Sequence, residues 1–430
     1  MQLNKGNLSH ILILFVILLS SDMIAQVRIS SPYSYYGVGN LRSDSYNTVL
    51  MSMGGIRNAV NSGNMINIFN PATYIVFDSS TFLFEGGVLS SRRTLKNINT
   101  SENASYASLN HLLFGFPVSK RFKASFGIVP YSDVGYNILT QQYLTNIGKT
   151  QIQYEGNGGI TQVFAGTAVK ITKNLSLGAN AFYNFGTIEK SRNIFFPDSI
   201  DTYINAQMDN LFRVGDFSFS FGMLYRKVMK NKQIISAGLT YSPQTRLKTR
   251  REYLANTFIG SYNGVEYFGD TVVYDKEHSG TITIPMQAGA GITLEMPLHW
   301  KIGIDFNWQE WSKYEAFGYK DSLKNSWSIA VGGEYIPDID ALRSYMKKIR
   351  YRLGFKYGMS NIYLRNNHLN EIGISFGFGL PVSRSSSMLN FGFEIGKFGT
   401  TNNNLIRENF VKFTLGITIH ENWFIRSKYR

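Results

Sequence analysis

The sequence predicts an all-β protein, a transmembrane antiparallel β-barrel of about fourteen strands whose lumen is plugged by an N-terminal hatch. Three observations predict this fold. Apolar and polar side chains alternate along many segments, the connections between these segments are alternately short and long, and a secretory leader precedes a chain that has no long apolar run. Together these features are typical of a protein that crosses a membrane with strands rather than helices.

The alternation of side chains is clearest in residues 370–380, where Ile372, Ile374 and Phe376 share one face and small residues occupy the other. Such strands have one face in an apolar medium and one in a polar or crowded medium. Candidate strands of this kind lie near residues 81–90, 108–118, 123–139, 155–171, 175–186, 215–228, 233–242, 280–295, 299–309, 326–336, 349–359, 370–381, 388–398 and 409–420.

The connections support an up-and-down barrel with tight periplasmic turns and long outer loops. Short links are expected at residues 119–122, 172–174, 229–232 and 296–298. Long links are expected at residues 91–107, 187–214, 243–279 and 310–325. We further expect strand extensions near 189–196 and 262–274, and a short amphipathic helix at 337–348. An even strand number places both ends of the barrel on the periplasmic side.

Residues 1–25 resemble a cleaved signal peptide, because Lys5 precedes a nine-residue apolar core at 11–19 that is too short to span a bilayer. Residues 26–78 have no sustained period and are expected to form the hatch, and residues 79–430 are expected to form the barrel. This organisation predicts export to the outer membrane of a Gram-negative bacterium.

Composition excludes several classes of site. The chain has no Cys, so a disulfide scaffold, a thiolate metal site, a cysteine nucleophile and a lipoprotein anchor are excluded. The histidines beyond the leader are scattered, and no pair has metal-ligand spacing. We therefore expect no metal, no cofactor and no catalytic residues. The net charge of +14 is spread over strand ends and turns, which favours contact with anionic lipid head groups, lipopolysaccharide included, over nucleic-acid binding.

Two glycines in QAGAGI, Gly289 and Gly291, superficially match a dinucleotide-binding loop. They lie within a candidate strand, and no helix is expected after them. We interpret them as small residues on a crowded face of a strand.

Pro130 interrupts the third candidate strand. Proline cannot donate to a sheet ladder, so the strand either kinks there or ends at Val129, with residues 130–134 forming a loop. If the strand continues, Pro130, Tyr131 and Asp133 are candidates for a lateral opening from the lumen to the lipid.

Three segments resemble the FadL-type family of outer-membrane transport proteins. Residues 54–74 are similar to the family's N-terminal hatch and end in an Asn-Pro-Ala box at Asn70, Pro71 and Ala72. Residues 304–314 contain Trp308, Trp311 and Ser312, similar to a strand end of the family, and residues 351–358 are similar to the strand that follows it.

The resemblance implies a plugged fourteen-stranded barrel through which hydrophobic compounds enter from outside and leave through a kink in the third strand. Two functions stay open. One is passive uptake of hydrophobic small molecules. The other is a non-transporting barrel subunit of an outer-membrane protein secretion or barrel-assembly complex, whose partners are other outer-membrane or periplasmic proteins. The expected outer loops at 187–214 and 243–279 are polar, basic and rich in Tyr.

Overall fold

The computed structural model describes residues 31–42, 47–78, 81–145, 147–197, 203–260, 267–382 and 386–422. The predicted signal peptide at 1–25 and the first residues of the predicted hatch lie outside the described residues. Among the described residues, no helix is both long enough and apolar enough to cross a bilayer.

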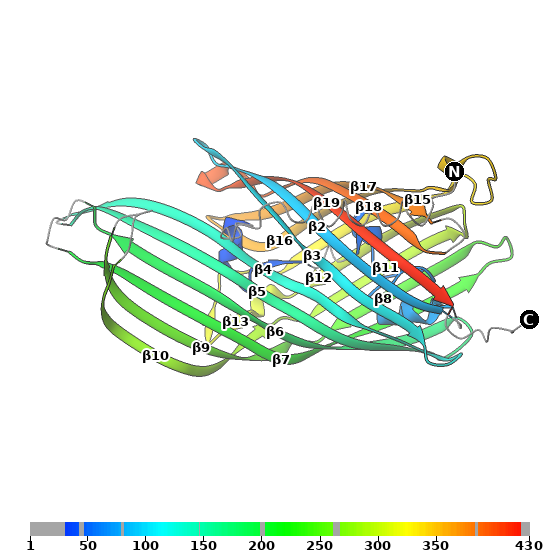
Figure 1. Cartoon of the computed structure of the whole chain (residues 1–430), viewed down its shortest axis with the longest axis horizontal. Coiled ribbons are helices and arrows are strands. Elements are labelled where there is room, and N and C mark those ends of the chain that lie inside the picture. Colours follow the sequence, from blue (N-terminus) through cyan, green and yellow to red (C-terminus); the bar gives the residue numbers. More distant parts are fainter. Residues whose placement is uncertain are drawn as a thin grey trace, which may run out of the picture.

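Fourteen strands close into an antiparallel barrel, as predicted (Figure 1). The ring closes where the last strand pairs with the first, from Asn422↔Thr81 to Arg407↔Lys96. In ring order the strands are β2 (Thr81–Lys96), β3 (Ser101–Pro117), β4 (Phe122–Leu144), β5 (Gly148–Lys170), β6 (Leu175–Phe195), β7 (Asn205–Val228), β8 (Ile234–Ser242), β11 (Gln287–Met296), β12 (Trp300–Gln309), β15 (Ser326–Tyr335), β16 (Arg350–Leu364), β17 (Asn367–Pro381), β18 (Met388–Phe398) and β19 (Arg407–Asn422).

The predicted alternation holds along the wall. In β12, Ile302, Ile304 and Phe306 are about half exposed on the outer face, whereas Asp305 and Asn307 are buried on the inner face. This arrangement places apolar side chains toward lipid and polar side chains toward the lumen.

Three of the four long outer loops were predicted wrongly, because most of their residues continue the strands, whereas residues 310–325 do connect β12 to β15, as predicted. At 91–107 and 187–214, β2, β3, β6 and β7 run on as paired strands. Residues 243–279 fall mostly in a long hairpin of β9 (Thr245–Ile259) and β10 (Tyr267–Ile284). Sequence period missed these extensions because both faces of a sheet beyond the membrane are wet, so side chains no longer alternate. The extension predicted at 189–196 is confirmed, and the one predicted at 262–274 belongs to β10 from Tyr267 onward.

Smaller differences concern three other segments. The strand predicted at 280–295 is two strands, β10 and β11, separated at Pro285. The predicted helix at 337–348 is reduced to one 3-10 turn, η4 (Tyr345–Lys348), and the Asp338 carboxylate instead accepts the backbone N–H of Asp340 in a local turn. Other short elements outside the wall are η3 (Trp311–Lys313), β13 (Glu315–Ala316), β14 (Tyr319–Lys320) and η5 (Asn402–Asn404).

The N-terminal segment, residues 31–42 and 47–78, lies inside the ring of strands (Figure 1). Its regular elements are short: η1 (Pro32–Tyr35), β1 (Asn40–Leu41), α2 (Thr48–Met51) and η2 (Pro71–Val76). Its apolar side chains pack against inward-facing side chains of the wall in three buried clusters. The core of the molecule therefore lies between this segment and the barrel.

Candidate functional site: the lumen and two breaks in the wall

Asn58 of the N-terminal segment is bound on every side by the wall. Its side-chain amide donates to the carbonyl oxygens of Ala290 and Phe306 and to Asn307 Oδ1, at 3.1–3.3 Å. Its Oδ1 accepts a hydrogen bond from Thr240 at 3.0 Å. Because the Asn58 side chain is buried, these bonds also avoid the cost of an unsatisfied polar group there.

Asp305 on β12 binds the same turn of the N-terminal segment. One oxygen of its buried carboxylate accepts the backbone N–H groups of Arg57 and Asn58, at 2.5 and 2.6 Å. Charge-assisted hydrogen bonds of this kind are about twice as strong as neutral ones. The turn is therefore fixed to β12 by the backbone itself.

The Asn-Pro-Ala box caps η2 and ties it to the wall. The Asn70 side chain accepts from Ala72 N at 3.1 Å, and its amide donates to the carbonyl oxygens of Asn58 and Met223, at 2.6 and 3.1 Å. Pro71 occupies the first position of the 3-10 helix, where its fixed φ suits the turn. The structure thus gives these residues an anchoring geometry, and their role as a hatch stays a prediction.

Further contacts reach other parts of the ring. Asn47, which caps α2, donates to Glu85 of β2 at 3.0 Å, and Gly54 N donates to Ser375 of β17 at 2.7 Å. The Tyr74 hydroxyl hydrogen-bonds to Asn180 Oδ1 of β6 at 3.0 Å. The N-terminal segment is therefore bonded to strands on several sides of the ring.

Glycines of the wall make room for this close approach. A Cβ at Gly354 of β16 would lie 2.0 Å from Gly54 N, and one at Gly238 of β8 would lie 1.9 Å from the carbonyl oxygen of Asn58. The same crowding explains Gly289 and Gly291, which lie in β11 with no helix after them, as predicted. Small residues at these positions let a backbone pass directly against the inner face of the sheet.

The first break in the wall lies between β3 and β4. Their ladder covers only Leu112↔Ile128 to Pro117↔Lys123, although both strands continue beyond it. The third strand does not end at Val129, because β4 runs through Pro130 and stays paired with β5, with a register shift between Pro130 and Ser132. Beyond the pair Leu112↔Ile128, the described parts of β3 and β4 have no ladder pairs with each other.

The N-terminal segment covers this break from inside. β1 pairs with the edge of β4, with Asn40 opposite Asp133 and Leu41 opposite Ser132. The backbone N–H of Arg42 continues the contact by donating to the Tyr131 carbonyl oxygen at 3.0 Å.

Arg42 bridges the two diverging strands. Its guanidinium forms an ion pair with Asp133 of β4 at 2.9 Å and donates to Tyr106 and Ser108 of β3, at 3.3 and 2.5 Å. Arg42 and Asp133 are both buried. A single side chain therefore connects both sides of the break.

Ion pairs line other parts of the lumen. Lys356 lies 2.8 Å from Glu371 and 3.6 Å from Glu394, and Glu394 lies 3.2 Å from Lys412. At another place on the wall, Glu334 pairs with Arg352 at 2.7 Å. Among the described residues, no group of three His, Cys, Asp or Glu side chains has the geometry of a metal site.

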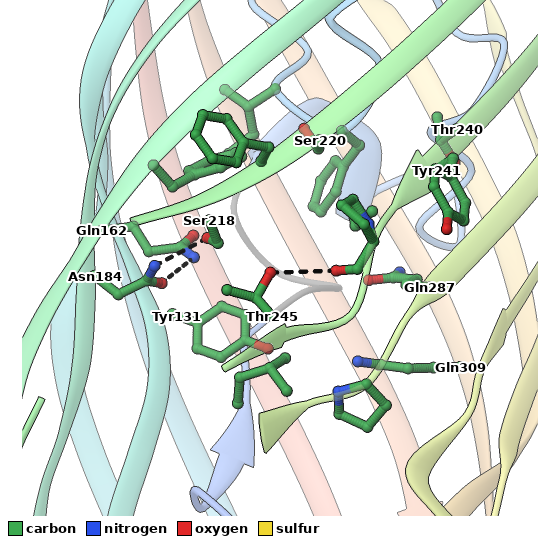
Figure 2. A pocket seen from close by; sticks show the side chains of 18 of the residues that line it. Tyr131, Gln162, Asn184, Ser218, Ser220, Thr240, Tyr241, Thr245, Gln287 and Gln309 are labelled. Carbon is green, nitrogen blue, oxygen red and sulfur yellow. Dashed lines mark hydrogen bonds between the residues drawn. The ribbon is translucent and has the colours of Figure 1, made fainter. Parts of the chain in front are cut away.

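Two of the cavities among the described residues lie in the lumen beside the N-terminal segment. One of about 120 Å³ lies against β7, β8 and β11, where Gln162 binds Asn184 at 2.7 Å and Asn184 binds Ser218 at 2.9 Å (Figure 2). The other, of about 200 Å³, lies near Tyr33 and Lys356 and has a mostly polar lining. Both lie in the lumen beside polar side chains.

The tryptophan motif lies at the end of β12 that faces the hairpin of β9 and β10. Trp308 pairs across the sheet with Trp327, while Trp311 in η3 is buried and packs on Tyr314, with ring centroids 5.8 Å apart. Ser312 is exposed, and its N–H donates to Asn325 Oδ1. Trp311 belongs to the buried apolar cluster against which Tyr131 of β4 packs, whereas no hydrogen bond or ring contact of the described residues joins the tryptophan motif to Asn70.

The sequence did not identify Arg42, Asn58 or Asp305. Asp305 offers a usable signal, since it is a carboxylate on the inner face of a strand whose other face is apolar. Its partner Arg57 is 248 residues away in the chain, and the pairing cannot be inferred from spacing.

The ring of fourteen strands, the lumen-filling N-terminal segment and the break beside the third strand define the fold class: a transmembrane β-barrel of fourteen strands filled by its own N-terminal segment. Among solved structures, the fold is similar to the Ralstonia pickettii toluene transporter TbuX, with a TM-score of 0.59 and 12% identity over 88% of this chain and 98% of that one. It is also similar to the Pseudomonas putida toluene transporter TodX, with a TM-score of 0.57 and 14% identity over 88% and 99% of the two chains. A Pseudomonas aeruginosa FadL homologue has a TM-score of 0.55 and 13% identity over 88% and 98%.

The BamG family model matches residues 8–430, and the chain belongs to this family. No curated protein matches its sequence.

Proposed function

We propose that the chain is a closed barrel subunit of an outer-membrane protein assembly complex, in which residues 26–78 act as a fixed plug. The observation that carries the proposal is the binding of the N-terminal segment to strands around the ring, through Asn47, Asn58 and Asn70. A segment held by buried, satisfied polar groups resists displacement by a passing solute. Membership of the BamG family supports a barrel-assembly context.

The cavities support the same proposal through their size and polarity. Pockets for small-molecule ligands usually measure about 300–1,000 Å³ and have mostly apolar walls. The two cavities of about 120 and 200 Å³ are smaller, and the larger one has a mostly polar lining, whereas the smaller one combines amide and hydroxyl groups with a larger apolar surface. A polar, filled lumen is a poor path for a long acyl chain.

A second candidate function is passive uptake of hydrophobic small molecules. The break between β3 and β4 supports it, because this is where a lateral exit would need the wall to part. Pro130, Tyr131 and Asp133 would shape that exit, and Asn70, Pro71 and Ala72 would anchor the hatch. Two proteins of similar fold, TbuX and TodX, are toluene transporters.

Depletion of the chain from its native cells distinguishes the two functions. If it is an assembly subunit, unrelated outer-membrane barrels should fall in abundance and in heat-modifiable mobility on gels, and the tagged chain should elute from mild detergent in constant ratio with other envelope proteins. Labelled toluene uptake should then stay unchanged. Loss of toluene uptake with normal levels of other barrels would instead support the transport function.

A further inference from the structure

The wall has a second break, between β7 and the β8–β9 strand pair. β7 pairs with β8 up to Phe221↔Tyr241 and with β9 from Val214↔Thr249 onward. Residues 215–220 of β7 have no ladder pair on this side in the described strands, although their pairing with β6 is continuous. We call this break the β7–β9 opening.

Two prolines account for the opening. β8 and β9 are separated at Pro243, and their partners β11 and β10 are separated at Pro285. The two bent strands remain paired with each other on both sides of the bend, at Ser242↔Gln287 and Thr245↔Ile284. The pair therefore bends together away from β7, which stays straight enough to keep its ladder with β6.

The opening connects the outer face with the lumen. Phe219 and Tyr241 line the 120 Å³ cavity, and each is also nearly half exposed on the outer face. Gln162 and Asn184, which point inward, line the same cavity from the lumen side (Figure 2). Around the outer end, Phe217 is exposed as well, so the rim of the opening is aromatic and faces lipid.

Two cations of β9 lie next to this aromatic rim. Arg246 and Lys248 of β9 are exposed, whereas Leu247 between them is buried toward the lumen. Val214 pairs with Thr249, and the next contact is the Lys248 N–H donating to Asp216, so Lys248 and then Arg246 follow the last ladder pair at the edge of the opening. Among the described residues, the Arg246 guanidinium and the Lys248 ammonium have no carboxylate within 4 Å, unlike Arg213, which lies 3.0 Å from Glu252; the Asp216 carboxylate accepts only the backbone N–H of Lys248, at 3.0 Å.

The side of the membrane follows from the connections. The first strand of the barrel begins and the last one ends at the end that carries the β3–β4 link, where Thr81 pairs with Asn422, whereas the β9–β10 hairpin lies at the other end (Figure 1). An even strand number places both ends of such a barrel on the periplasmic side, so β9 faces the outer leaflet. An outer-leaflet lipid brings phosphate and acyl chains together at this level.

We propose that the β7–β9 opening binds lipopolysaccharide, with a phosphate at Arg246 and Lys248 and one acyl chain lying across Phe219 and Tyr241 into the opening. Along the membrane normal, the cations of the site lie at the level of the lipid phosphate, and the aromatic surface lies at the level of the acyl chain. The inference does not depend on which proposed function holds, since both place the chain in the same membrane.

The test uses the full-length chain purified in mild detergent from a host that makes lipopolysaccharide, with bound lipid measured by native mass spectrometry. The variant Arg246→Gln/Lys248→Gln should retain about tenfold less lipopolysaccharide, since loss of the two exposed charge-assisted contacts together weakens binding by roughly this order. The matched control is Lys227→Gln/Lys230→Gln, which removes the same charge at the periplasmic end and should retain lipid normally. Heat-modifiable mobility confirms that each variant is folded.

A second arm separates the lipid sources and the acyl contact. Lipid-free protein is placed in phosphatidylcholine vesicles that contain either lipopolysaccharide or phosphatidylglycerol, and thermal unfolding is followed. The proposal is supported if lipopolysaccharide stabilises the protein and phosphatidylglycerol does not, and if this stabilisation is reduced in Phe219→Ser/Tyr241→Ser. Equal stabilisation by phosphatidylglycerol overturns the assignment to lipopolysaccharide, and unchanged retention in Arg246→Gln/Lys248→Gln, or equal loss in the control, overturns the site.

Discussion

The two breaks in the wall differ in how they are closed. At the β3–β4 break, the chain's own N-terminal segment adds β1 to the strand edge and places Arg42 across it. At the β7–β9 opening, the rim is aromatic on the outer face. Among the described residues, a hydrogen bond from the Lys248 backbone N–H to the Asp216 carboxylate, at 3.0 Å, crosses it. The difference teaches that one break is closed by polar, buried groups from inside, whereas the other presents an apolar rim to the membrane.

The largest effect is expected from Arg42→Ala, which breaks the closure at β3–β4. It leaves the buried Asp133 carboxylate without its cation, which typically costs about 3–5 kcal/mol in the free energy of unfolding. We expect that loss in denaturant titrations of the barrel in lipid vesicles. Because the chain has no Cys, a single Leu41→Cys should also react about tenfold faster with maleimide in this variant, as local opening grows.

The control for Arg42→Ala is the pair Arg42→Ala/Asp133→Asn, which removes the stranded charge and should recover part of the lost stability. Lipopolysaccharide retention at the β7–β9 opening should be unchanged in Arg42→Ala. If Leu41→Cys reacts equally fast with and without Arg42, the guanidinium does not hold the closure.

A smaller effect is expected from Gly354→Ala, which tests whether the closure depends on how the N-terminal segment is seated. The new Cβ would lie 2.0 Å from Gly54 N, and a backbone cannot yield as a side chain can. Overpacking of this kind costs about 1–3 kcal/mol in the free energy of unfolding. Gly86→Ala is the matched control, because its Cβ would meet its nearest neighbour at an ordinary 3.5 Å. Equal denaturation midpoints for the two variants would contradict the crowding argument.

The sequence predicted the strands of the wall better than the contacts that fill it. Alternation identified β12 and β17 because each lies between lipid and lumen, and such a strand carries its environment in its own residues. Alternation did not identify the hairpin of β9 and β10, since a sheet in water on both faces has no such pattern. Arg42 and Asn58 escaped for another reason: their partners come from distant strands, and only the closed ring brings them together.

Alkaline pH should lower the stability of the fold through Tyr33 of the N-terminal segment. Burial raises the pKa of Tyr33 to about 12, and its hydroxyl donates to the Ile406 carbonyl oxygen at 2.7 Å. Since the pKa is raised above the ordinary value of 10.0, the fold favours the neutral phenol. The resulting stabilisation is complete below about pH 10 and is lost as the pH rises toward 12.

The measurement is the denaturation midpoint of the wild type and of Tyr33→Phe between pH 9 and pH 12. The wild type should lose about 2 kcal/mol more than the variant over this range, which is most of the roughly 3 kcal/mol that a shift of two pKa units represents. Parallel curves for the two proteins would show that Tyr33 does not titrate with folding.

The smallest effect is expected from Pro130→Ala, which asks whether proline alone parts β3 from β4. The edge of β4 beyond Pro130 is already used, because Ser132 and Asp133 pair with β1 and the Tyr131 carbonyl oxygen accepts from Arg42. Restoring one N–H donor therefore should not draw β3 back to β4, and the free energy of unfolding should change by at most about 1 kcal/mol. The reaction rate of Leu41→Cys should stay the same in the variant. If that rate falls sharply instead, β3 has displaced β1, and Pro130 rather than the N-terminal segment sets the position of the break.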